Sequence, residues 1–226
     1  METTMDSALN SNRETMYRFL GRLYKIEVDQ LLLDQMKGTS FPSGDSAGEL
    51  GEGYRMLEQY LRHPGPDPLT DLAVDYAKVF LGAGIYKDSG AAYPYESVYT
   101  SPERIIMQDA RDQVMALYRA KGLGKAETWD FPEDHIALEL EFMACLCSET
   151  QQAIDRQEGR AALACLREQQ DFLTGHLLNW VPAFCADIRK FAGTVFYQAA
   201  AQITHGYLDL DHTLLKDMMA EPAGRS

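Results

Sequence analysis

The acidic and imidazole side chains between Trp129 and Met143 are the part of this chain best suited to chemistry. The segment reads Trp-Asp-Phe-Pro-Glu-Asp-His-Ile-Ala-Leu-Glu-Leu-Glu-Phe-Met, so Asp134, His135 and Glu139 stand at the start of an otherwise apolar run. Placing ionisable groups among apolar residues costs free energy unless the charges are paired. The pattern therefore makes this segment a candidate functional site.

A helix is predicted to position these side chains. Asp130 can act as its N-cap with Glu133 three residues on, and Pro132 is tolerated in the first turn, where backbone N–H groups have no partner within the helix. The helix is therefore expected to begin near Pro132 and to run to about residue 157. Helical spacing then places His135 and Glu139 one turn apart.

A metal-dependent hydrolase is one hypothesis for this pattern. His135 and Glu139, with Asp134 or Glu141, can bind a divalent metal ion and activate water. A second histidine four residues on is missing, however, and the other histidines stand in unrelated contexts: His63, His176, His205 and His212. The glycines of Gly82-Ala-Gly84 are also too few for a phosphate-binding loop.

The composition is that of a globular protein. The chain has 226 residues, 46% of them hydrophobic, and a net charge of −13. This charge argues against binding to nucleic acid and favours a basic partner, although it also serves solubility. No apolar run is long enough to cross a bilayer, and the first residues lack an export-signal pattern, so a cytoplasmic protein without membrane insertion is expected. The four cysteines form no CxxC pair and are expected to be reduced.

Helical periodicity dominates the chain, which predicts an all-α fold: a single globular domain over residues 1–226 with about ten helices. The expected helices span residues 11–26, 28–36, 52–62, 69–81, 101–121, 132–157, 160–178, 182–202 and 211–219, with Gly193 bending or splitting the helix that contains it. In the helix from residue 101, Ile106, Ala110, Val114 and Leu117 are expected to be buried.

Three segments are expected to lie outside helices. Residues 37–53 are rich in Gly and Ser and predict a mobile loop, and residues 220–226 predict a frayed tail. Residues 82–100 form a long irregular stretch, and such loops in compact domains usually have a function.

The order of motifs resembles the TorD/DmsD/NarJ group of chaperones for molybdenum enzymes, nearest to its TorD and DmsD branches. The segment from Pro132 to Met143 is similar to the group's Pro-x-Asp-His-Ile-x-x-Glu-Leu-x-Phe-Met signature, which is specific. Two further matches lie upstream, Glu96-Ser-Val-Tyr99 and Tyr76-Ala-Lys-Val-Phe-Leu-Gly82, and His176-Leu-Leu-Asn-Trp180-Val-Pro182 lies downstream. The resemblance covers roughly residues 69–182. The chain departs from DmsD-like members at Tyr76 and at Tyr95-Glu96, where they carry Trp and Trp-Gly.

The resemblance implies a cytoplasmic, all-helical chaperone of anaerobic respiration. Such a protein binds the twin-arginine signal peptide and the mature part of a molybdopterin-containing reductase subunit, and holds it until cofactor insertion and export by the Tat pathway. It acts as a monomer or a domain-swapped dimer, and no catalytic reaction, cofactor or metal of its own is implied.

A receptor for paired guanidinium groups followed by an apolar run needs carboxylates beside an apolar groove. Glu96, Asp134 and Glu139 can supply the carboxylates, and His135 can position them by hydrogen bonding. The apolar wall is expected from Tyr76, Val79, Phe80, Val98 and Tyr99, and the motifs add Tyr95, Ser97 and Pro132.

Two other interpretations of the same residues are open. In the first, Asp134 only caps the helix and His135 pairs with Glu139 one turn on, which contributes about 0.2–0.5 kcal/mol. In the second, the chain is a generic all-α interaction module whose ten methionines and long loop provide an adaptable surface.

Overall fold

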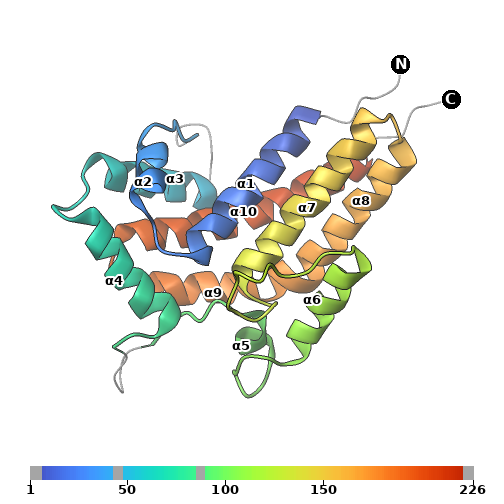
Figure 1. Cartoon of the computed structure of the whole chain (residues 1–226). Coiled ribbons are helices and arrows are strands. Elements are labelled where there is room, and N and C mark those ends of the chain that lie inside the picture. The colour runs from blue at the N-terminus through green and yellow to red at the C-terminus, as the bar shows by residue number, and fades with distance from the viewer. Residues whose placement is uncertain (1–6, 43–47, 85–89, 221–226) are drawn as a thin grey trace. The chain divides into compact units, whose positions relative to one another are not determined.

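The computed structural model describes residues 7–42, 48–84 and 90–220 of the chain. Within these ranges it contains ten α-helices and one π-helical turn and no strand, which confirms the all-α prediction (Figure 1). Parts of the expected 37–53 loop, of the 82–100 loop and of the C-terminal tail lie outside the described residues.

The helices are α1 (Ser7–Lys25), α2 (Gln30–Lys37), α3 (Gly48–Arg62), α4 (Pro68–Leu81), α5 (Glu96–Thr100), α6 (Asp109–Ala120), α7 (Ile136–Asp155), α8 (Gly159–Phe172), α9 (Leu178–Phe191) and α10 (Val195–Ala220). The π-helical turn η1 (Leu173–Leu177) directly follows α8. No helix in the described ranges combines the length and apolar character that crossing a membrane requires.

The chain divides into two compact units. The first comprises Met1–Arg22, Tyr95–Asn179 and Leu208–Ser226, and the second comprises Leu23–Pro94 and Trp180–Tyr207. That the whole chain acts as one domain stays a prediction.

The first unit is built around α7 and α8 and carries a buried polar network in its core. Arg13 on α1 is 2% exposed; its guanidinium donates to Asp211 Oδ2 at 2.9 Å and to Gln169 Oε1 at 2.6 Å. The hydroxyl of Tyr17 donates to the same Asp211 oxygen at 2.6 Å. This network joins α1, α8 and α10 within the unit.

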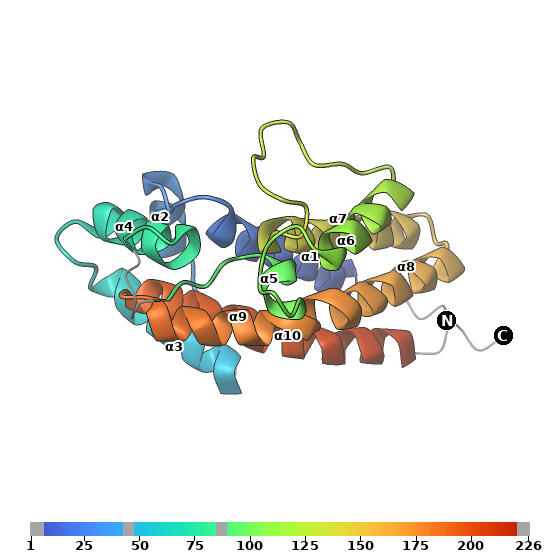
Figure 2. The same cartoon turned by 90° about the horizontal axis from the view of Figure 1, so that it is seen from below.

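The connection from α6 to α7 projects away from these helices (Figure 2).

The second unit has an aromatic core. Tyr24, Phe80, Phe184 and Tyr197 meet edge to face or tilted, with Phe80 5.3 Å from Tyr197 and 5.7 Å from Tyr24 between ring centroids. Asp75 accepts hydrogen bonds from the backbone N–H groups of residues 193 and 194, each at 2.8 Å, and so ties α4 to the start of α10.

Several helix boundaries differ from the prediction, including the start of α1, which lies at Ser7 and not at residue 11. The helix α3 begins at Gly48, not near residue 52, because its glycines serve packing: a Cβ on Gly53 would lie 2.8 Å from the backbone of Ile203. The split at Gly193 is confirmed, but α10 continues without a second break to Ala220. Gly206 is kept in this helix because a Cβ there would lie 2.5 Å from the backbone nitrogen of Leu50.

The prediction for α6 was wrong at its start. The helix begins at Asp109, and the preceding segment holds Arg104 and Met107 at φ values of 53° and 61°, which a right-handed helix does not adopt. Ile106 and Leu117 are 44% and 39% exposed, whereas both were expected to be buried. The buried residues of α6 are Ala110, Val114 and Tyr118.

Candidate functional site

The short helix α5 lies against the first residues of α7, so the structure brings together two of the predicted motifs. The backbone N–H of Glu96 donates to the carbonyl of Asp134 at 3.0 Å, and the N–H of Ser97 donates to Asp134 Oδ2 at 2.9 Å. Tyr95 and His135 form an isolated antiparallel bridge. All of these residues belong to the first unit. The structure therefore brings Glu96, Asp134 and His135 together, but each is at most 3% exposed, so these side chains do not line an open groove as was expected.

The N-cap of α7 is His135, and the helix starts at Ile136, later than the expected Pro132. The ring nitrogen Nδ1 of His135 accepts the backbone N–H of Ala137 at 3.1 Å, the bond that Asp130 was expected to provide. The His135 ring stacks on Phe131, with 4.1 Å between centroids. Burial lowers the pKa of His135 to about 3. The imidazole is therefore neutral near pH 7, with its proton on Nε2.

Three carboxylates are buried together at this junction. Glu96 is 2% exposed, and Asp134 and Glu139 are fully buried. Burial raises the pKa of Asp134, and the nearby charge of Glu96 adds to the effect. The pKa of Tyr118 lies well above its ordinary value because of burial and then because of Glu139, Glu96 and Asp134. The phenol of Tyr118 thus stands in the negative field of the same cluster.

Two acids of the cluster, Glu96 and Asp134, lack a lysine or arginine partner in the described part of the chain. Within the same ranges, Asp134 Oδ1 has no hydrogen-bond donor. Two cations pair with the neighbouring Glu133 instead: Arg111 Nε lies 2.6 Å from one of its oxygens and Lys125 Nζ lies 3.8 Å from the other. A buried carboxylate oxygen without a donor is unusual, and it can receive one from a water molecule or from a ligand.

A histidine that sequence reasoning placed in an unrelated context belongs to this site. His176, on η1, is 9% exposed, and its Nδ1 lies 2.9 Å from Glu96 Oε2. His176 could have been included in the site, because it is the first residue of the downstream motif of the resemblance. Its pairing with Glu96 could not be predicted, because the two residues lie 80 residues apart in sequence.

The predicted apolar residues divide between the two units. Val98 is buried beside the acidic cluster, while Tyr95, Tyr99 and Pro132 are partly exposed in the first unit. Three others are buried in the second unit, each at most 5% exposed: Tyr76, Val79 and Phe80. The Tyr76 hydroxyl donates to the carbonyl of Tyr24 at 2.9 Å. The latter three residues thus pack the core of their own unit.

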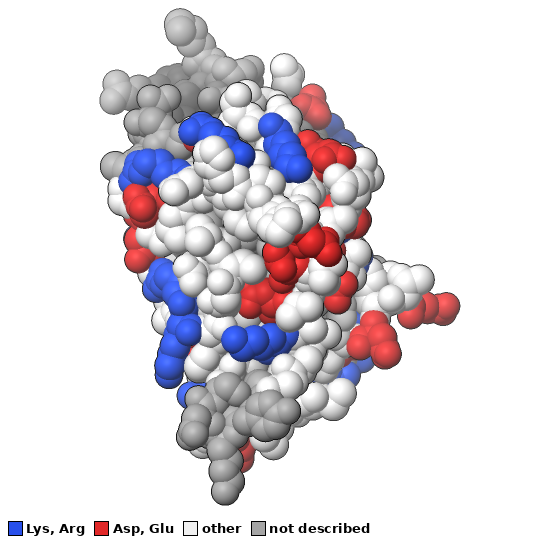
Figure 3. Space-filling model, turned by 90° about the vertical axis from the view of Figure 1, so that its left-hand side faces the viewer, with Lys and Arg blue, Asp and Glu red and all other residues white. Residues whose placement is uncertain are grey.

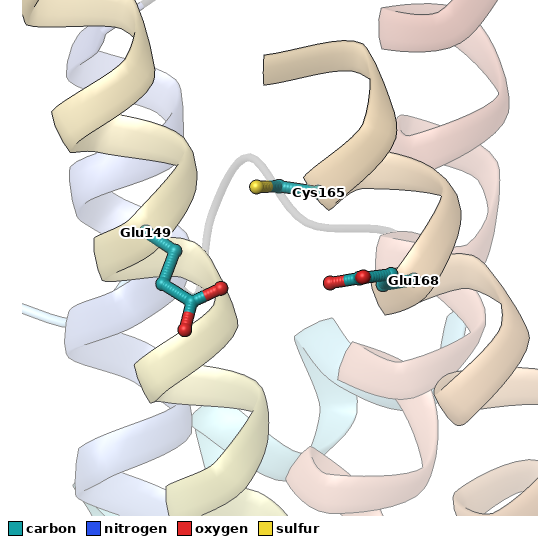
Figure 4. Close-up of side chains that lie close together, drawn as sticks. All are labelled: Glu149, Cys165 and Glu168. Atoms are coloured by element: carbon teal, nitrogen blue, oxygen red, sulfur yellow. The ribbon is translucent and has the colours of Figure 1, made fainter. Parts of the chain in front are cut away.

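Three other side chains in the described part of the chain lie close enough together to hold a metal ion. Glu149 on α7 and Cys165 and Glu168 on α8 offer atoms within 4.8 Å of one another (Figure 4). Lys121 Nζ lies 2.8 Å from Glu149 and also contacts Glu168, so an ammonium group already neutralises these acids. Burial, then the charge of Glu149, raises the pKa of the Cys165 thiol. The cluster is a salt bridge and does not include His135 or Glu139.

One face of the protein has acidic side chains gathered near its middle (Figure 3). That face carries both acidic and basic side chains with uncharged surface between them (Figure 3). A pocket of about 240 Å³ lies in the second unit between the end of α2 and α3, beside Phe41 and Arg62. None of the predicted site residues lines this pocket.

Comparison with known proteins places the chain in a family. The family model described as "Nitrate reductase delta subunit" matches residues 45–186, more than half of the chain. The chain is also similar to proteins named "Chaperone protein TorD". The one from Vibrio cholerae (El Tor Inaba) is 31% identical over 94% of this chain and 96% of the relative. Those from Aliivibrio fischeri and Shewanella pealeana are 28% and 25% identical, over 91% and 93% of this chain and 95% and 92% of the relatives.

The chain therefore belongs to the nitrate reductase delta subunit family and, within it, to the TorD-type chaperones. This confirms the family to which the motifs around Glu96 and Asp134 pointed.

Proposed function

We propose that this chain is a cytoplasmic chaperone that binds the twin-arginine signal peptide of a molybdopterin-containing reductase subunit and holds that subunit until its cofactor is inserted. In this proposal the acidic cluster of Glu96, Asp134 and Glu139 receives the guanidinium groups. The relatives from Vibrio cholerae are named as TorD chaperones, which supports the role.

One observation carries the proposal. Two motif segments that lie far apart in sequence place Glu96 and Asp134 together in the interior, and neither acid has a lysine or arginine partner among the described residues. A charge-assisted hydrogen bond from an arginine contributes about 1.5–3 kcal/mol, more than most exposed ion pairs. A guanidinium from a ligand can supply the donor that Asp134 Oδ1 lacks.

Access to the cluster requires movement of α5. The helix has only five residues, and its backbone is held to α7 by the bonds of Glu96 and Ser97 to Asp134. A helix of this length has little stability of its own, so displacing it costs little compared with unfolding the bundle. In the proposal the peptide displaces the Tyr95–Thr100 segment and bonds to the carboxylates beneath it, while the partly exposed rings of Tyr95 and Tyr99 contact its apolar run.

The test is calorimetric titration with a synthetic peptide that has two adjacent arginines followed by an apolar run of about ten residues. A control peptide carries glutamine at both arginine positions. We expect the arginine peptide to bind at least about tenfold more tightly, and Glu96→Gln to abolish most of that difference. The variant Glu158→Gln, which neutralises an exposed acid of the same unit, is the matched control. Equal affinity of the wild-type protein for both peptides would refute the proposal.

A further inference from the structure

His176 and Glu96 are in direct contact, although they lie 80 residues apart in sequence. Nδ1 of His176 lies 2.9 Å from Glu96 Oε2, and to a carboxylate, which can only accept, this nitrogen is the donor. His176 lies on η1, a segment distant in sequence from both α5 and the start of α7.

The ring of His176 is held in place from its other side. It stacks on Phe172 at 4.9 Å, Phe172 meets Phe142 at 4.8 Å, and Phe142 meets Tyr118 at 4.8 Å between centroids. Tyr118 in turn lies in the field of the acidic cluster. The imidazole therefore belongs to a row of packed rings and has little freedom to turn away from Glu96.

The backbone that carries His176 is also unusual. Residues Leu173–Leu177 form a π-helical turn between α8 and α9. A π-turn inserts an extra residue and so changes the direction of the side chains that follow, and such turns occur frequently at functional sites. The insertion thus contributes to directing His176 toward Glu96.

We propose that His176 is a positioning residue, whose hydrogen bond holds the Glu96 carboxylate beside Asp134 so that both acids receive a guanidinium group together. This inference rests on the proposed function. Without the bond, Glu96 is repelled by the neighbouring carboxylates and turns toward solvent when α5 moves. Only a group that donates from the position of Nδ1 can replace the imidazole.

Two substitutions separate this role from simple packing. His176→Asn places an amide nitrogen where Nδ1 stands but removes most of the ring, whereas His176→Phe keeps a ring to stack on Phe172 but has no donor. We expect His176→Phe to weaken binding of the arginine peptide about tenfold, and His176→Asn to stay within about threefold of the wild type. Neither variant should change binding of the glutamine control peptide.

A purely structural role predicts the opposite ranking, with His176→Asn the weaker binder, or an equal loss for both peptides, and either result would overturn the inference. If His176→Phe does not fold, His176→Gln serves in its place, since its amide reaches the position of Nε2 and not that of Nδ1. In the Glu96→Gln background, replacing His176 should cause no further loss of affinity. A wild-type protein that does not distinguish the two peptides would instead refute the proposed function itself.

Discussion

Asp134 shows how one side chain serves both the fold and the proposed site. Its Oδ2 accepts the backbone N–H of Ser97 and so fixes α5, while Oδ1 has no donor among the described residues. Burial raises its pKa, which means that the folded state binds a proton there more readily than the unfolded chain. Stability from this group is therefore present at low pH and is lost as the pH rises through the folded-state pKa.

The direction of this pKa shift predicts how the variant Asp134→Asn behaves. Asparagine keeps an acceptor for Ser97 N–H and removes the buried charge, so the variant should melt at a higher temperature than the wild type at pH 7 and bind the arginine peptide about tenfold more weakly. Differential scanning calorimetry and peptide titration measure the two effects. A lower melting temperature together with unchanged affinity would assign Asp134 to structure alone.

His135 gives the opposite dependence on pH. Its pKa falls from 6.5 to about 3 on burial, so the unfolded chain binds the extra proton and the folded state loses stability as the pH falls below 6.5. Urea unfolding at pH 7 and pH 4.5 should show that the wild type loses up to about 1.4 kcal/mol per pH unit more than His135→Asn, which keeps a capping acceptor. Parallel losses in the two proteins would contradict a buried, neutral imidazole.

The motifs predicted which side chains lie close together, but not which hydrogen bonds they form. The proximity of Glu96, Asp134 and His135 followed from the motif order, whereas the exchange of the N-cap from Asp130 to His135 did not. Capping rules consider only partners that are close in sequence. Here the carboxylate of Asp134 accepts the backbone N–H of Ser97, which lies 37 residues away in sequence. The pairing of His176 with Glu96 is hidden for the same reason.

Helices with strong local signals were predictable, and those whose ends depend on distant packing were not. The helix α4 has Asp67 as its cap and Gly82 in the left-handed conformation at its end, and its limits match the prediction closely. The start of α6 was missed because Arg104 and Met107 occupy left-handed conformations, which residues other than glycine rarely adopt. The glycines of α3 were interpreted as loop residues, although they allow close helix packing.

The buried Arg13 network gives a prediction at the scale of elements. Arg13→Ala leaves Asp211 buried without its guanidinium, so the free energy of unfolding should fall by about 3–5 kcal/mol in urea titrations. Arg18→Ala, on the same helix, removes a guanidinium that is 44% exposed and paired with Glu14 and Glu141, and should cost less than about 1 kcal/mol. Similar losses for both variants would show that the network does not hold α1 in the first unit.

For the whole molecule, the net charge of −13 favours the approach of a cationic segment. In the proposed function, the cluster of Glu96, Asp134 and Glu139 then provides specificity at short range. Long-range attraction is screened by salt, with a Debye length of about 10 Å at 0.1 M, whereas buried contacts are screened less. The two contributions can thus be separated by ionic strength.

Raising the salt concentration from about 0.05 M to about 0.5 M should slow association of the arginine peptide several-fold while changing its dissociation rate less. The glutamine peptide should show a smaller dependence because it carries fewer positive charges. Stopped-flow fluorescence gives both rates. An equal salt dependence for the two peptides would remove electrostatic attraction from the mechanism.

The most direct test of the acidic cluster as the peptide site is photo-crosslinking, with a photoreactive residue placed next to the two arginines of the peptide and the adducts located by mass spectrometry. The proposed site predicts adducts within residues 95–100 and 131–139, and their loss when excess unlabelled arginine peptide competes. Adducts confined to other segments, such as the exposed residues Ile105, Ile106 and Met107 or the pocket beside Phe41, would contradict it.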